Sequence, residues 1–261
     1  MKAVILAGGY GTRLGDATRT RPKPMVEVGG RPILWHIMKM YGAYGITDFV
    51  VCCGYKGNSI KDYFAGYSVH ESDVTFDLKR GDVEFHRRNG EPWRVTLVDT
   101  GEYTKTGGRI KRARDYLDEE TFLLTYGDGV ASLDISRLVD FHRRQGRMAT
   151  LTAVRPPGRF GGLELAQGGT RVVAFDEKSR ARPQDLLEWV NGGFFVLEPG
   201  IFDYLKSDDS VWEHEPLEML ARAGELASFC HEGFWHPMDT PHDRVSLESL
   251  WANGEAPWKK W

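Results

Sequence analysis

The chain opens with a short apolar run that ends in a cluster of glycines. Residues 2–7 read KAVILA, which predicts a buried β-strand, and Gly8, Gly9 and Gly11 follow directly. Glycines in this place let backbone N–H groups turn toward an anion without interference from a Cβ atom. In open α/β sheets ligands bind beyond the carboxyl ends of the strands, so this loop is a candidate wall of a binding site. An ordinary strand-to-loop turn is the alternative interpretation of the glycines alone.

Three side chains near the glycines favour phosphate as the ligand. Thr12 supplies a hydroxyl group, Arg13 a guanidinium fork, and Lys23 an ammonium group on a segment that two flanking prolines restrict. The loop lacks the Gly-Lys-Ser/Thr sequence that closes a P-loop, and Leu14 stands where a dinucleotide fingerprint requires glycine. The run therefore predicts a triphosphate-binding loop that differs from those of P-loop kinases and dehydrogenases.

Strand-like and helix-like segments alternate along the rest of the chain. In the first half, strands are expected at 48–53 and 121–125, and helices near 33–44, 56–64 and 108–117. Residues 74–85 and 95–98 are expected to form antiparallel strands or a hairpin insertion. The second half predicts helices at about 134–145, 216–222 and 241–251, with strands at 149–154 and near Leu163, Val172 and Phe194. This pattern indicates an α/β fold with a mixed, mainly parallel sheet covered by helices.

Composition and charge exclude several classes of function. The formal net charge of -3 argues against the broad basic surface of a duplex nucleic-acid binder. The longest apolar runs have the length of strands, so neither a membrane span nor a secretory signal is expected, and we predict a cytoplasmic protein. The eight histidines lack the spacing of a zinc protease motif. The three cysteines are expected to be buried thiols, and most of the eight tryptophans are expected to pack in the core.

Two motifs together resemble the signature of the sugar nucleotidyltransferase family, also called sugar-nucleotide pyrophosphorylases. They are LAGGYGTRL at residues 6–14 and PKPM at residues 22–25. The chain is most similar to the cytidylyltransferases of that family, through residues 35–40, 52–57, 99–101, 106–109, 156–161, 234–240 and 256–259. The similarity covers essentially the whole chain. Two departures are Arg21, where lysine is common in the family, and a lengthened tract at residues 179–188.

The resemblance implies a fold and a reaction. The fold is the nucleotide-diphospho-sugar transferase architecture, a Rossmann-like three-layer α/β/α domain over residues 1–261, with a nucleotide-binding half at about 1–130 and a sugar-phosphate-binding half at about 131–261. The reaction is Mg²⁺-dependent transfer from CTP to α-D-glucose 1-phosphate, giving CDP-glucose and pyrophosphate for deoxysugar synthesis. A homo-oligomer is also implied, with a hexamer as the candidate assembly. The alternatives are UTP, dTTP or another sugar 1-phosphate as substrate, or a nucleotide-binding regulatory protein without turnover.

The resemblance also assigns the nucleotide site. Arg13 and Lys23 act on the triphosphate and are the catalytic candidates. The full set of nucleotide-binding residues that the resemblance implies is Leu6, Ala7, Gly8, Gly9, Gly11, Thr12, Arg13, Lys23, Thr104, Arg109 and Gly127. Without the resemblance, Arg109 could be a surface residue at a helix start and Thr104 a solvated loop residue.

The chemistry requires charge cancellation more than a strong base. A sugar phosphate is largely dianionic at neutral pH and attacks the α-phosphorus in line while pyrophosphate leaves. Magnesium held by carboxylates and phosphates is the usual means of offsetting the charge. The resemblance places the ion on Asp128 and Asp239, and the sugar phosphate on Lys178 and Asn191. The alternatives are a turn aspartate for Asp128, a helix cap for Asp239, a solvated lysine for Lys178 and a tight turn for Asn191.

Overall fold

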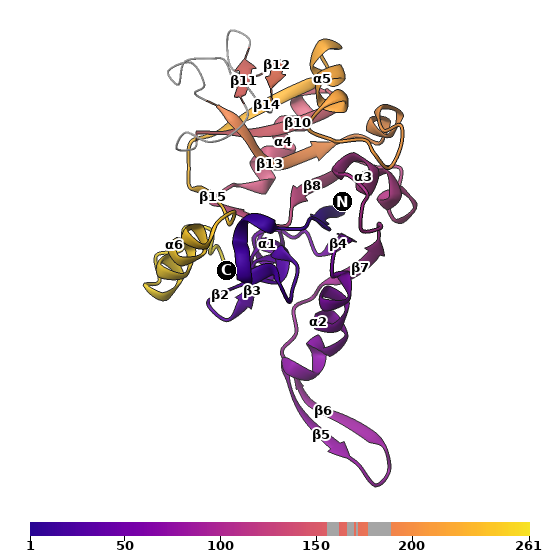
Figure 1. The fold of residues 1–261 in the computed structure, drawn as a ribbon, viewed down its shortest axis with the longest axis vertical. Helices are drawn as coiled ribbons and strands as arrows, with labels where there is room; N and C mark the ends of the chain where they lie inside the picture. Colours follow the sequence, from indigo (N-terminus) through magenta and orange to yellow (C-terminus); the bar gives the residue numbers. More distant parts are fainter. Residues whose placement is uncertain (156–161, 166–169, 171, 177–188) are drawn as a thin grey trace.

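The computed structural model describes residues 1–155, 162–165, 170, 172–176 and 189–261 (Figure 1). Within these residues a nine-stranded mixed sheet forms the centre of the molecule. Its strands are β1 (Ala3–Ala7), β4 (Asp48–Cys53), β7 (Arg94–Asp99), β8 (Phe122–Tyr126), β10 (Ala149–Val154), β11 (Gly162–Leu165), β12 (Val172–Asp176), β13 (Val190–Leu197) and β14 (Leu226–His231).

The middle of the sheet is parallel. Its main path runs β12-β11-β13-β8-β1-β4-β7, and β10 pairs with β13 and with β14. Strands β8, β1, β4 and β7 are parallel to one another, whereas β13 is antiparallel to both β8 and β10. The expected mixed sheet is confirmed. The expectation of an antiparallel strand at 95–98 is wrong, because the chain crosses over before β7 and pairs it parallel to β4.

Helices cover both faces of this sheet. In β1 the side chains of Ala3, Ile5 and Ala7 enter one core and those of Val4 and Leu6 enter the other, as the two-residue period of a strand requires. The first core is covered by α1 (Ile33–Gly42), α2 (Gly57–His70), α4 (Ile135–Gln145) and α6 (Pro241–Ala252). The second is covered by α3 (Thr106–Ala113), α5 (Glu215–Arg222) and the 3₁₀ helix η5 (Pro199–Tyr204), and η3 (Arg114–Tyr116) continues α3. The three-layer α/β/α expectation is confirmed.

Within the described part of the chain, three small antiparallel pairs lie outside the main sheet. They are β2 (Glu27–Val28) with β3 (Arg31–Pro32), β5 (Ser72–Asp77) with β6 (Asp82–Arg88), and β9 (Gly129–Ala131) with β15 (Trp235–Pro237). The β5–β6 hairpin follows α2 and projects away from the body of the molecule (Figure 1). It is therefore an insertion in the crossover between the parallel strands β4 and β7.

Helix α6 and the residues after it pack against α1 through an aromatic cluster. His36 is fully buried, its Nε2 lies 2.8 Å from the Val28 carbonyl oxygen, and Trp258 Nε1 donates to its Nδ1 at 3.3 Å. Because Nδ1 accepts, His36 is neutral with its hydrogen on Nε2, and burial lowers its pKa to about 4. Trp251 and Trp261 lie against the same ring. The expected packing of tryptophans in the core is confirmed for this cluster.

The cysteine expectation is only partly correct. Cys52 and Cys53, on β4, are buried, and burial raises the pKa of both thiols. Cys230, on β14, is exposed, so the prediction of a buried thiol is wrong there. Among the residues that the structure describes, no helix has the length and apolar character needed to cross a membrane.

Candidate active site

Two cavities meet beyond the carboxyl ends of β1 and β8. The first has a volume of about 510 Å³ and the second about 340 Å³. Their common wall is formed by Arg13, Tyr126, Asp128, Val211, Glu213 and Asp239. Residues from both ends of the chain therefore meet where the two cavities adjoin.

Every residue predicted to bind the nucleotide lines the first cavity. This set contains Leu6, Ala7, Gly8, Gly9, Gly11, Thr12, Arg13, Lys23, Thr104, Arg109 and Gly127. The parallel pairing of β1 with β8 explains the outcome, because it brings the loop after each strand to the same edge of the sheet.

The glycine-rich loop is shaped by close contacts that a side chain would disrupt. Gly11 adopts φ 63°, and a Cβ there would lie 2.9 Å from the Cβ of Lys23. A Cβ on Gly8 would lie 2.2 Å from Arg109 Nη1. The 3₁₀ helix η1 (Thr12–Thr18) begins directly after Gly11. Glycine is therefore needed at these two positions for conformation and for space.

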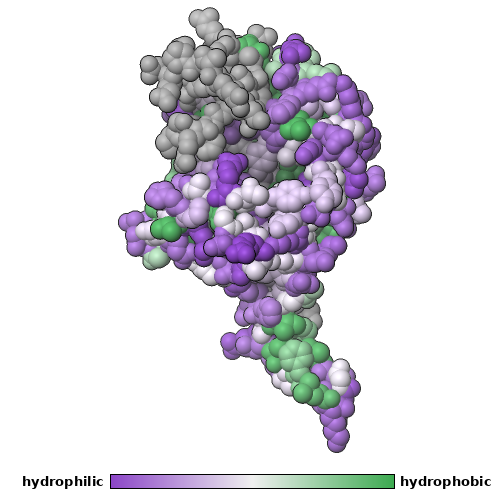
Figure 2. All heavy atoms as spheres, viewed as in Figure 1, coloured by the Kyte–Doolittle hydropathy of each residue, from purple (hydrophilic) through white to green (hydrophobic). Residues whose placement is uncertain are grey.

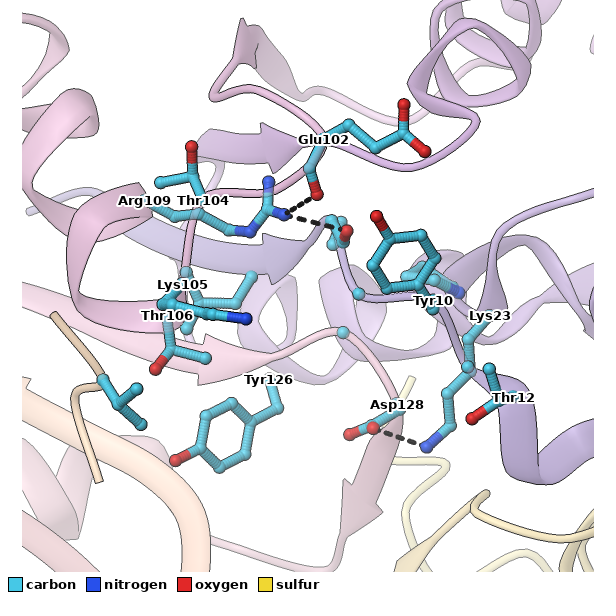
Figure 3. A pocket seen from close by; sticks show the side chains of 18 of the residues that line it. Tyr10, Thr12, Lys23, Glu102, Thr104, Lys105, Thr106, Arg109, Tyr126 and Asp128 are labelled. Atoms are coloured by element: carbon cyan, nitrogen blue, oxygen red, sulfur yellow. Dashed lines mark hydrogen bonds and ion pairs between the residues drawn. The ribbon is translucent and has the colours of Figure 1, made fainter. Parts of the chain in front are cut away.

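Arg109 holds two loops of the first cavity together. It is only 4% exposed, so its interpretation as a surface residue is wrong. Its Nη2 donates to the carbonyl oxygens of Gly8 and Glu102 at 3.0 and 3.1 Å (Figure 3). Its Nη1 donates to Thr100 Oγ1 at 2.7 Å and to the Gly101 carbonyl oxygen at 2.8 Å. Burial lowers the pKa of Arg109, and these oxygens replace the water that burial removes.

Lys23 lies between the two aspartates that were predicted to hold a metal ion. It belongs to the short 3₁₀ helix η2 (Lys23–Met25), and its Nζ lies 2.6 Å from Asp128 Oδ2 and 2.5 Å from Asp239 Oδ1 (Figure 3 shows the first contact). Arg13 Nη1 lies 3.2 Å from Asp239 Oδ2. Burial disfavours the charged form of Lys23, but the two carboxylates outweigh it and raise its pKa.

The two carboxylates form a pair of hard oxygen donors around one cation. Lys23 supplies that positive charge in this structure, which shows that the two side chains can face a common centre. No group of three or more His, Cys, Asp or Glu side chains suited to a metal occurs among the described residues. Two carboxylates are a number that suits Mg²⁺, which commonly completes its octahedron with substrate phosphates and water.

Backbone contacts bring the two aspartates together. The antiparallel pair β9–β15 sets Gly129 opposite Pro237, and the Met238 N–H donates to the Asp128 carbonyl oxygen at 2.8 Å. Pairing of these short strands therefore fixes the distance between two loops that are far apart in the chain.

Asp239 does not cap the following helix, so that alternative is wrong. Thr240 is the N-cap of α6 and forms a capping box with Asp243. Asp243 Oδ2 accepts hydrogen bonds from the N–H groups of Asp239 and Thr240 at 3.0 and 2.7 Å. Burial alone would raise the pKa of Asp243, but its hydrogen bonds with Thr240 help to lower it overall. The side chain of Asp239 is left to face Lys23.

The second cavity is lined by a different set of polar groups. Asn191 Nδ2 donates to Tyr126 Oη at 3.3 Å, and Asn191 Oδ1 accepts from the Gly193 N–H at 2.9 Å. Trp235 Nε1 donates to the Gly192 carbonyl oxygen at 2.7 Å. Asn191 lies inside β13, so its interpretation as a tight turn is wrong. Lys178 and the tract at 179–188 lie outside the described residues.

Several residues of the cavity walls were missed by sequence analysis. They are Tyr10, Tyr103, Lys105, Thr106, Tyr126, Val211, Glu213, His214 and Trp235. The pair Gly107–Gly108 was a usable signal, because adjacent glycines at the start of a helix indicate a close neighbour. That neighbour is the segment that carries Glu213, as a Cβ on Gly108 would lie 2.5 Å from the Asp208 carbonyl oxygen.

Comparison with known proteins identifies the family of the chain. The model of the nucleotidyl transferase family matches residues 2–240. The glucose-1-phosphate cytidylyltransferase of Salmonella typhimurium is 57% identical, and the probable glucose-1-phosphate cytidylyltransferase of Bacillus subtilis is 44% identical; each alignment covers 100% of both chains. The crystal structure of HddC from Yersinia pseudotuberculosis shares the fold with a TM-score of 0.75 at 23% identity, over 96% of this chain and 99% of that one. The chain belongs to the nucleotidyl transferase family.

Proposed function

We propose that the protein transfers the cytidylyl group of CTP to α-D-glucose 1-phosphate, giving CDP-glucose and pyrophosphate. The observation that carries the proposal is the contact of Lys23 with Asp128 and Asp239 beside the wall shared by two cavities. Transfer between two phosphates needs a nucleotide on one side, a sugar phosphate on the other, and compensating charge between them. The relatives in Salmonella typhimurium and Bacillus subtilis, which carry the name of this reaction, support the choice of CTP and glucose 1-phosphate.

The nucleotide is assigned to the first cavity and the sugar phosphate to the second. Backbone N–H groups of residues 8–12 and the side chains of Thr12 and Arg13 would hold the triphosphate. When the nucleotide binds, the ammonium group of Lys23 would leave Asp128 and Asp239 and contact a phosphate oxygen. Asn191, in the second cavity, would orient the sugar phosphate so that its oxygen attacks the α-phosphorus opposite the departing pyrophosphate. No side-chain base is needed because the attacking phosphate is already dianionic. Lys178 remains a predicted contact of the same phosphate.

Asp128 and Asp239 would hold Mg²⁺, which fits their position and their chemistry. The bound ion supplies positive charge that offsets the charge developing around the α-phosphate. The chain contributes the fixed separation of the two carboxylates, set by β9–β15 and by the Met238–Asp128 hydrogen bond.

A substrate panel tests the proposal. The purified protein is incubated with Mg²⁺, glucose 1-phosphate and each of CTP, UTP, dTTP, ATP and GTP, and pyrophosphate release is measured. Fastest release with CTP is expected. If pyrophosphate is released only with another nucleotide, that nucleotide is the substrate and not CTP. If CTP binds but no pyrophosphate is released with any nucleotide, the protein is a regulatory one. Mannose 1-phosphate and galactose 1-phosphate serve as control acceptors.

We also propose that the chain forms a homo-oligomer through the β5–β6 hairpin, with a hexamer as the candidate assembly. Leu78 is 92% exposed, and Phe76 and Val83 are about half exposed. Hydrophobic residues are visible on this projection in Figure 2. A lone two-stranded hairpin is marginally stable in water, so a second chain packed on it would stabilise it. Light scattering on the wild type and on Phe76→Ser/Leu78→Ser tests this: a smaller assembly is expected for the double variant.

The division into two halves and the cytoplasmic location stay predictions. The first cavity draws Glu213 and Asp239 from the second half, and the second cavity draws Arg13 and Tyr126 from the first. We therefore propose that residues 1–261 act as one unit with two binding regions. Cell fractionation checks the location.

A further inference from the structure

Glu213 lies on the wall between the two cavities, and the partners of its carboxylate differ from those of Asp128 and Asp239 on the same wall. Asp128 and Asp239 both contact Lys23. Among the described residues, the hydrogen-bond partner of the Glu213 carboxylate is the Thr106 hydroxyl, which donates to Oε2 at 2.6 Å, and no cation pairs with it. Within the part of the chain that the structure describes, Glu213 therefore brings to this wall a carboxylate that forms no ion pair.

The position of Glu213 is fixed by the segment that carries it. Residues 207–214 run along the start of α3, where the Lys105 N–H donates to the Asp208 carbonyl oxygen at 2.8 Å. The Trp212 N–H donates to Thr106 Oγ1 at 2.9 Å, so one hydroxyl group joins the backbone and the side chain of consecutive residues. Trp212 is fully buried and packs edge-on against Phe195 at 5.8 Å between ring centroids. The neighbour of Glu213 in the chain is thus anchored in the second core.

The charge of Glu213 restricts what it can face. A carboxylate close to phosphate oxygens is unfavourable unless a cation lies between them, and Lys23 and Arg13 near this wall contact Asp128 and Asp239 instead. A carboxylate is a strong acceptor for hydroxyl groups. A carboxylate without an ion pair at this wall is therefore matched by the hydroxyl-bearing part of a substrate and not by its phosphate groups.

The second cavity presents the other groups that a hexose needs. Glu213, Asn191 and Trp235 all line it, and they supply a carboxylate, an amide and an aromatic ring. Tyr126 lies on the wall it shares with the first cavity, and in Figure 3 its ring is seen between Thr106 and Asp128. Polar groups at fixed positions in a cavity set the orientation of a small ligand.

We propose that Glu213 is a specificity-determining residue that accepts a hydrogen bond from a hydroxyl group of the sugar in the sugar 1-phosphate. The proposal rests on the proposed function and adds a residue to it. Thr106 holds Oε2, which leaves Oε1 for the substrate. Glu213 is partly buried, and a hydrogen bond to a charged group discriminates against an analogue that lacks the hydroxyl.

The test combines variants of Glu213 with deoxy analogues of the substrate. Steady-state kinetics are measured for the wild type, Glu213→Gln and Glu213→Ala, with glucose 1-phosphate and its 2-, 3-, 4- and 6-deoxy forms. For Glu213→Ala, a rise of about 10- to 100-fold in KM for glucose 1-phosphate is expected, with KM for CTP changed less than about twofold. Glu213→Gln keeps an acceptor oxygen and its rise is smaller. For one deoxy analogue the wild type and Glu213→Ala have the same KM, because the partner hydroxyl is already gone.

A matched control is Glu215→Gln, two positions along the chain, whose carboxylate is exposed and contacts Lys206. Its KM for glucose 1-phosphate is expected to equal that of the wild type. Equal losses of Glu213→Ala with all deoxy analogues, or a larger change in KM for CTP than for the sugar phosphate, overturn the proposal. Circular dichroism verifies the fold of each variant. If Glu213→Ala does not fold, the kinetics of the isosteric Glu213→Gln test the proposal in its place. Absence of turnover by the wild type with these substrates would instead contradict the proposed function.

Discussion

Lys23 and Asp239 are 216 positions apart in the chain, yet Lys23 Nζ lies 2.5 Å from Asp239 Oδ1. The same ammonium group contacts Asp128 at 2.6 Å. These three residues come from η2, from the loop after β8 and from the segment before α6. A site assembled from three such distant segments depends on the whole fold, and each of the following predictions perturbs one of its supports.

Replacing Lys23 with alanine is expected to separate its two roles. Without nucleotide, Mn²⁺ should bind at least about tenfold more tightly, a change equivalent to about 1.4 kcal/mol, because the carboxylates lose a competing cation. Turnover should fall about 100-fold or more, because the phosphates lose a donor. Electron paramagnetic resonance of free Mn²⁺ measures the first effect and pyrophosphate release the second.

Arg13→Ala is the control for the metal measurement. Arg13 also contacts Asp239, but its side chain is 75% exposed, so solvent screens the interaction. Its effect on Mn²⁺ binding is expected to be much smaller than that of Lys23→Ala. Equal effects, or unchanged Mn²⁺ affinity in Lys23→Ala, would contradict a competition between Lys23 and the metal.

Asp243→Asn is expected to remove a pH-dependent part of the stability. The folded-state pKa of Asp243 is lowered below its ordinary value of 3.8, so its stabilising effect is fully present above that pH and is lost as the pH falls below it. The free energy of unfolding of the wild type should exceed that of Asp243→Asn by about 1 kcal/mol at pH 6, and the difference should shrink below pH about 4. Urea denaturation across this range measures it. A constant difference would exclude the ionised capping box as the cause.

His36 is expected to make the protein less stable in mild acid. Its pKa falls from 6.5 in the unfolded chain to about 4 in the folded one, so protonation favours the unfolded state. Stability is complete above pH 6.5 and is lost as the pH falls from 6.5 to about 4, at about 1.4 kcal/mol per pH unit. His36→Gln, which is uncharged, should flatten this part of the stability profile. His70→Gln, at the exposed end of α2, is the control and should retain the slope.

Gly8→Ala and Gly9→Ala form a matched pair that isolates the contact with Arg109. A Cβ on Gly8 would meet the Arg109 guanidinium, whereas a Cβ on Gly9 would meet nothing within 4 Å. We expect Gly8→Ala to lower the free energy of unfolding by about 2 kcal/mol and Gly9→Ala to change it by less than about 0.5 kcal/mol. Thermal unfolding gives both values. Similar losses would mean that Arg109 moves aside at little cost.

The sequence alone predicted the parts of the molecule that depend on local patterns. The strand at 2–7 and its glycine loop were found because strand periodicity and glycine placement are properties of neighbouring residues. The direction of β7 was not found, since the hairpin at β5–β6 resembles the start of an antiparallel sheet and only the crossover sets the pairing. The exposure of Cys230 likewise depends on its place in the sheet.

Sequence analysis could predict only those site residues that lie in motifs shared with the family. Thr104, Arg109 and Asp239 were named from the resemblance, but the spacing of residues does not reveal that Arg109 is buried with backbone carbonyls as partners. The residues around Glu213 gave no signal of their own, because its place follows from the contact of residues 207–214 with the glycines of α3. The positions of these residues in the site thus depend on long-range packing, which the periodicity of the sequence does not reveal.

The contact between the tryptophans after α6 and His36 on α1 has a consequence for the order in which the molecule is made. During translation, the segment of β1 and α1 emerges from the ribosome long before Asp239 and Trp258 are synthesised. Until then the nascent chain lacks the partner of one face of α1 and one of the two carboxylates around Lys23. The fold therefore delays completion of the proposed site until these late residues have been synthesised, so that a nascent chain interrupted before residue 239 holds neither a finished core nor a finished site.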